Sequence, residues 1–183
     1  MNWLNTALVL GAAFLAVFWE AAFSGVRHLV GAQIDLLPPL MVYAGLCTGT
    51  TTVALLAFCG GLWLDSLSAN PLGVTVLPLF AIGMALHLKR ELILRDQTFA
   101  QVVLGLGASA AAPILTLLVL LTMGQAPLLG WGTLWQLVVL SVGGAVATPI
   151  CFELFGWLQR TLVHHGAAAP SFRPDREIRR GRL

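Results

Sequence analysis

A stretch of 29 residues without a charged side chain, from Leu36 to Leu64, most constrains how this chain can fold. A single straight helix of that length would measure about 43 Å, whereas the hydrocarbon core of a bilayer is about 30 Å thick. Its middle, residues 48–52, reads Thr-Gly-Thr-Thr-Thr, a poor helix centre that favours a turn. We therefore predict two short helices, over about 36–47 and 51–65, with Pro38 and Pro39 in the first turn of the first one.

The composition indicates that lipid is the solvent for most of the surface. Of the 183 residues, 58% are hydrophobic and 10% are charged, whereas a typical soluble domain has about 25% charged residues. So few charges cannot cover a water-soluble globule of this size. The chain is thus predicted to be an all-α integral membrane protein with about six transmembrane helices. The other four apolar runs cover residues 4–23, 72–88, 99–123 and about 133–158.

The chain divides into a transmembrane helical domain, residues 1–165, and a basic tail, residues 166–183. The tail holds five arginines against Asp175 and Glu177 and is too polar to span a membrane. We expect it to be disordered and to lie against the anionic cytoplasmic leaflet.

The distribution of Lys and Arg predicts the orientation. The tail and the cluster Lys89, Arg90 and Arg95 are two spans apart, so both are expected in the cytoplasm, and the uncharged loop 124–132 outside. Six spans place both termini in the cytoplasm. Five spans, with 36–64 as one bent helix, would place the N-terminus outside. Charge counting slightly favours five spans, whereas helix length and the threonine cluster favour six.

Asp65 is a candidate for a structural or interaction role. It follows Gly61 at the end of a predicted helix and precedes Asn70, Pro71 and Gly73, which are typical turn residues. A carboxylate in this position most often holds a turn through local hydrogen bonds. Binding of a cation or a partner is the alternative.

Glu20 and Glu153 are also candidates, because an ionisable side chain in or near hydrocarbon is costly unless it is paired. Structural ion pairs are the expected explanation. The six-span arrangement places Glu20 near Arg27 and Asp65 at the outer face. The predicted neighbours of Glu153 at the inner face are His87, Lys89 and Arg160.

No constellation in the sequence predicts catalysis, and we expect no enzyme, cofactor or metal site. A His-Glu-x-x-His zinc motif, a phosphate-binding glycine loop and a nucleophile elbow are all absent from the sequence. The pair His164-His165 has no Cys or carboxylate at ligand spacing. The basic tail lacks the interleaved aromatic residues of a nucleic-acid-binding segment.

Three motifs in a fixed order resemble a known family. They are Leu36-Leu-Pro-Pro-Leu-Met-Val-Tyr43, then Ala57-Phe-Cys-Gly-Gly-Leu-Trp-Leu-Asp65, then Ser68 through Pro71-Leu-Gly73, followed by an apolar helix closed by Lys89-Arg90. In this order they resemble the rod-shape-determining membrane protein family MreD. The resemblance covers residues 36–96, about a third of the chain. The arginine-rich tail and Cys47-Thr-Gly-Thr depart from the family pattern.

The resemblance implies a non-enzymatic subunit of the bacterial cell-elongation machinery in the inner membrane. The implied partners are MreC, the actin-like MreB, and the elongation peptidoglycan synthase with its transpeptidase. The implied fold is similar to the S-components of vitamin transporters.

Two alternatives remain open. A true S-component would bind a small vitamin-type ligand or a metal ion in an outward cavity, for which the sequence offers few polar groups outside the threonine cluster. An intramembrane enzyme would need paired catalytic groups that the sequence does not display.

Overall fold

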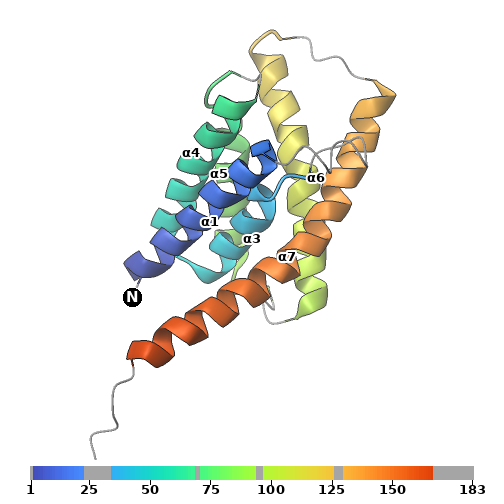
Figure 1. Cartoon of the computed structure of the whole chain (residues 1–183). Coiled ribbons are helices and arrows are strands. Elements are labelled where there is room, and N and C mark those ends of the chain that lie inside the picture. Colours follow the sequence, from blue (N-terminus) through green and yellow to red (C-terminus); the bar gives the residue numbers. More distant parts are fainter. Residues whose placement is uncertain (1, 23–33, 69–70, 94–96, 126–129, 167–183) are drawn as a thin grey trace, which may run out of the picture. The chain divides into compact units, whose positions relative to one another are not determined.

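The computed structural model describes residues 2–22, 34–68, 71–93, 97–125 and 130–166, without the side chains of residues 2 and 162–166. The described residues form an all-α fold of six helices (Figure 1). The helices are α1 (Asn2–Ala22), α3 (Leu37–Cys47), α4 (Thr50–Leu67), α5 (Val76–Lys89), α6 (Thr98–Thr122) and α7 (Trp131–Gly166). By length and hydropathy α1, α4, α6 and α7 can each cross a membrane, and α3 and α5 are shorter apolar helices. The predicted multi-pass all-α membrane protein is therefore confirmed.

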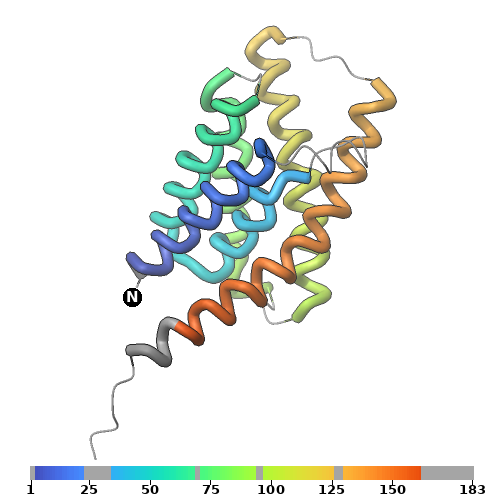
Figure 2. The backbone as a smooth tube through the Cα atoms, in the orientation of Figure 1, coloured from blue at the N-terminus to red at the C-terminus, as the bar shows by residue number. Residues whose placement is uncertain are grey.

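The predicted break in the uncharged stretch is confirmed. Thr48 and Gly49 are extended, with ψ of −177° and 163°, so they separate α3 from α4. The backbone turns back on itself between the two helices (Figure 2). Two prolines occupy the first turn of α3, where their missing N–H groups leave no helical hydrogen bond unmade.

The short helix α3 lies at the centre of the helices around it. It contacts α1, α4, α5 and α6, and 10 of its 11 residues are buried. A helix that is apolar on every side is stable only when other elements cover it. The core therefore forms around α3, with Val42 and Leu46 packed in one cluster with Ile82, Ala108 and Ala112.

Small residues allow close helix contacts in this fold, as is common between membrane helices. A Cβ atom added at Gly45 of α3 would lie 3.0 Å from the Gly83 carbonyl oxygen of α5. One added at Gly61 of α4 would lie 2.9 Å from the Cα atom of Val76 in α5. Gly49, by contrast, faces open space.

The chain forms two compact units, Met1–Phe152 and Glu153–Leu183. Helix α7 runs through the boundary and ends at Gly166, beyond the predicted end near residue 158. The polar residues from Gln159 onward continue the helix because neither Gly nor Pro interrupts residues 157–165. The predicted tail, apart from Gly166, lies outside the described residues.

Candidate functional site

The Asp65 turn, residues 65–75, joins α4 to α5 through a buried carboxylate. Asp65 is 1% exposed. Its Oδ2 atom accepts hydrogen bonds from the backbone N–H groups of Gly73, at 2.8 Å, and Thr75, at 3.1 Å. Its Oδ1 atom accepts a hydrogen bond from the Thr75 hydroxyl. The side chain therefore ties the end of one helix to the residue that precedes the next.

The neighbouring motif residues shape the same turn. Gly73 has a φ of +92°, a conformation that glycine adopts without the strain that a Cβ atom causes. The Pro71 carbonyl accepts a hydrogen bond from the Val74 N–H at 3.4 Å. Gly61, one helical turn before Asp65, lets Val76 pack directly on α4. The structure thus brings Gly61, Asp65, Pro71 and Gly73 together.

The Asp65 turn also explains where α5 begins. The sequence predicts an apolar helix from residue 72, whereas α5 starts at Val76. Residues 72–75 form turns instead, because Asp65 binds the N–H groups of Gly73 and Thr75. An interaction ten residues apart thus shortens the helix.

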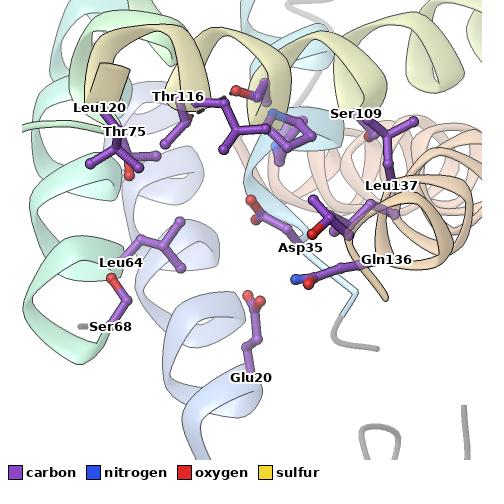
Figure 3. A pocket seen from close by; sticks show the side chains of 16 residues that line it. Glu20, Asp35, Leu64, Ser68, Thr75, Ser109, Thr116, Leu120, Gln136 and Leu137 are labelled. Atoms are coloured by element: carbon purple, nitrogen blue, oxygen red, sulfur yellow. Dashed lines mark hydrogen bonds between the residues drawn. The ribbon is translucent and has the colours of Figure 1, made fainter. Parts of the chain in front are cut away.

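A second feature, the acidic cavity, adjoins the Asp65 turn within the first unit. It has a volume of about 400 Å³ and shares Ser68 and Thr75 with the turn (Figure 3). Its lining residues are Glu20, Asp35, Pro38, Leu64, Ser68, Thr75, Ser109, Ala112, Pro113, Thr116, Leu117, Leu120, Thr133, Gln136, Leu137 and Leu140. Half of these side chains carry a polar group and the other half are apolar.

Asp35 is placed by the start of α3. It precedes that helix by two residues, and its Oδ1 atom accepts the Leu37 N–H at 2.8 Å, one of the first N–H groups of a helix, which have no intrahelical partner. Burial raises the pKa of Asp35 from 3.8 to about 6, against the opposing effect of the Leu37 hydrogen bond. The carboxyl group is therefore mostly ionised at neutral pH, at a cost in free energy.

Glu20 of α1 faces the same space as Asp35, and the Gln136 amide of α7 reaches toward it (Figure 3). Among the described lining residues there is no Lys, Arg or His. Arg27, a predicted neighbour of Glu20, lies outside the described residues, and Asp65 instead binds Gly73 and Thr75.

Ser109 of α6 contributes a buried hydroxyl to the lining. Its side chain is 1% exposed, and its Oγ atom has no hydrogen-bond partner among the described residues. The Oγ atom lies against Gly144 of α7, where an added Cβ atom would collide with it. Buried hydroxyls are usually hydrogen-bonded, so this one is unusual.

The expectation of few polar cavity-lining groups outside the threonine cluster is wrong. Residues 48–52 do not line the cavity. The Thr48 hydroxyl donates to the Ala44 carbonyl at 2.6 Å, and the Thr52 hydroxyl lies 2.7 Å from that of Thr6. The lining comes instead from single polar residues on separate helices. The one local signal was Asp35, a carboxylate directly before a proline-led helix.

Glu153 belongs to neither set of residues. It is exposed on α7 in the second unit, and its predicted ion pairing stays a prediction. In the described part of the chain, no three His, Cys, Asp or Glu residues are grouped closely enough to hold a metal ion.

Comparisons with protein-family models, with curated proteins and with solved structures give no match. The resemblance to MreD rests on the residues from Leu36 to Asp96 themselves.

Proposed function

We propose that this protein is a non-enzymatic membrane subunit of the bacterial cell-elongation machinery, similar to MreD, and that it acts as a scaffold with MreC and MreB. The observation that carries the proposal is the Asp65 turn. The motifs of the resemblance form the buried central helix α3 and the carboxylate-tied turn between α4 and α5. They are thus engaged in building the protein.

The hydrogen bonds of Asp65 favour a structural role over a chemical one. Both carboxylate oxygens accept from groups of the same chain, the backbone of Gly73 and the backbone and hydroxyl of Thr75. A general base or a metal ligand needs an oxygen atom directed at its substrate or ion. In α4 and α5, the Asp65 oxygens are directed at the chain itself. A helix pair fixed in this way can serve as a rigid surface that other membrane proteins bind.

In this proposal the protein lies in the inner membrane with both termini in the cytoplasm. The basic tail then shares the cytoplasmic side with MreB. The elongation peptidoglycan synthase and its transpeptidase are partners in the same complex.

Co-purification from native membranes tests the scaffold. A tagged chain produced at its native level should recover MreC, and depletion of the chain should abolish rod shape. Asp65→Asn should reduce MreC recovery, whereas Glu91→Gln, at an exposed carboxylate beyond α5, should leave it unchanged. If MreC is recovered no better than from an untagged strain, and depleted cells stay rod-shaped, the scaffold proposal is wrong.

A second candidate function, a receptor for a small vitamin-type ligand, is favoured by the acidic cavity. Its volume of about 400 Å³ falls in the range of about 300–1,000 Å³ that is typical of ligand pockets. Mass spectrometry of small molecules released from the purified protein tests this function. A receptor should release one compound in near-stoichiometric amount, whereas a scaffold alone should release lipids.

A further inference from the structure

We infer that the first part of α7, residues 131–142, is a gate that opens the acidic cavity sideways to the bilayer by bending at Gly143 and Gly144. The inference rests on how α6 and α7 pack against each other. It depends on neither of the two proposed functions and on no charge in the cavity. Residues 131–142 are called the gate segment below.

The gate segment is the least packed part of α7. None of residues 131–140 is buried, and Ser141 is the first buried residue of this helix. Helix α1, by comparison, buries Val9, Ala13 and Val17 at successive turns. In a bilayer, lipid covers apolar side chains as well as another helix does, so contacts between helices are what hold them together. A segment with few such contacts moves at a low cost in free energy.

Directly after the gate segment, α7 is fixed against α6. A Cβ atom added at Gly105 of α6 would lie 2.6 Å from the Gly144 carbonyl oxygen, and one added at Gly144 would lie 3.1 Å from the Gly105 carbonyl oxygen. Ala145 is 6% exposed and Thr148 is fully buried. The unpacked and the fixed parts of α7 therefore meet at Gly143 and Gly144.

The acidic cavity lies between the gate segment and α6. The two helices line it with one face each, at spacings of three and four residues that match the helical repeat. Figure 1 shows α6 and α7 further apart at the ends that the loop between them joins. Movement of the gate segment away from α6 thus opens the cavity between two membrane-spanning helices. The lining residues are Ser109, Ala112, Pro113, Thr116, Leu117 and Leu120 of α6, and Thr133, Gln136, Leu137 and Leu140 of α7.

Two adjacent glycines supply the hinge. Glycine weakens a helix relative to alanine, because it has more backbone freedom to lose and no side chain to pack. The nine residues from Leu134 to Gly143 span about 14 Å of helix, so a bend of about 20° moves Leu134 by about 5 Å.

Distances between spin labels on the full chain in lipid nanodiscs test the gate. The three native cysteines are replaced by alanine, and double electron–electron resonance measures two labelled pairs. The first pair is Leu121→Cys with Leu134→Cys, and the second is Val103→Cys with Ile150→Cys on the other side of the Gly144 contact. All four positions are exposed, so the labels disturb no packing. The first pair should give a distribution about 5 Å wider than that of the second pair, or two maxima about 5 Å apart.

Gly143→Ala should narrow the first distribution, because alanine favours the straight helix. It is combined with Ile34→Ala, since the added Cβ atom would otherwise lie 2.9 Å from the Cγ2 atom of Ile34. Ile34→Ala alone and Gly132→Ala, where a Cβ atom meets nothing within 4 Å, are the controls and should leave the distribution wide.

Two results would overturn the inference. If the first pair is as narrow as the second, the gate segment does not move. If the first pair is wide in the Gly143→Ala/Ile34→Ala protein as well, the bend is not at the glycines. If that double variant fails to fold, the comparison of the two labelled pairs in the background without substitutions at 34 and 143 still decides.

Discussion

The Asp65 turn and the acidic cavity adjoin one another, and each contains an aspartate at the end or the start of a helix. In the turn, Asp65 is 1% exposed and accepts from two backbone N–H groups and a hydroxyl. In the cavity, Asp35 accepts from the Leu37 N–H and faces a volume of about 400 Å³. The turn satisfies its carboxylate with the chain's own donors, and the cavity leaves room for donors from another molecule.

The difference shows how surroundings decide what a buried carboxylate does. A charge compensated by the chain's own hydrogen bonds stabilises the fold, because removing it leaves the donors without an acceptor. A charge held at a cavity with fewer such bonds opposes folding and favours binding. Replacing the carboxylate by an amide should therefore have opposite effects on stability at the two aspartates.

The largest effect is expected at Asp65. Asp65→Ala leaves three donors without their acceptor, two of them buried and the Gly73 N–H partly buried, so the free energy of unfolding should fall by on the order of 3–5 kcal/mol. Asp65→Asn should lower the free energy of unfolding nearly as much. An amide replaces one acceptor oxygen by an NH2 group, which is itself a donor and would face the donors of Gly73 or Thr75. Thermal unfolding of the purified protein in detergent measures both variants.

Glu91→Ala is the control for Asp65, since it removes an exposed carboxylate in the described part of the chain. Its midpoint should equal that of the wild type. If the Asp65→Ala protein is abundant, stable and fully assembled but inactive, the structural role is wrong and Asp65 has a direct chemical role.

A smaller effect is expected at Gly61, where the turn packs on α4. Gly61→Ala places a Cβ atom 2.9 Å from the backbone of Val76, and such overpacking costs about 1–3 kcal/mol. Gly107→Ala is matched to it, because a Cβ atom there meets nothing within 4 Å. The same thermal scans should show a lower midpoint for the first variant only. Equal midpoints would mean that α5 shifts freely, and the turn would not be rigid.

The smallest effect is expected at Asp35 and has the opposite sign. Because burial raises the pKa of Asp35 to about 6 in the folded protein, its stabilising contribution is present below about pH 4 and is lost as the pH rises through about 6. The loss should be on the order of 1–2 kcal/mol, reduced by the partial exposure of the side chain. Asp35→Asn should thus raise the unfolding midpoint of the ligand-free protein at pH 7.

Thermal scans between about pH 4 and pH 7 separate this effect from other titrations. Glu20, the other titratable side chain among the described residues that line the cavity, is present in both proteins. The difference in midpoint between Asp35→Asn and wild type should grow with pH. A variant that is less stable than wild type at pH 7 would show that the Asp35 carboxylate supports the fold as Asp65 does.

The amino-acid sequence by itself determined the all-α membrane class, the helix positions to within a few residues except at the end of α7, and the division of residues 36–64 into two helices. Each of these follows from local quantities: hydropathy over the length of a span, and turn residues at 48–49. The turn residues Asp65, Pro71 and Gly73 were identifiable for the same reason, since they lie within nine residues of one another.

Only the tertiary structure decided which side chains meet. Glu20, Asp35, Ser109 and Gln136 come from four separate segments, and no local periodicity records that they face one cavity. The start of α5 was likewise set by Asp65, ten residues before Thr75, against an apolar pattern that predicts a longer helix. Such contacts depend on how helices pack, which is determined by the shapes of many side chains together.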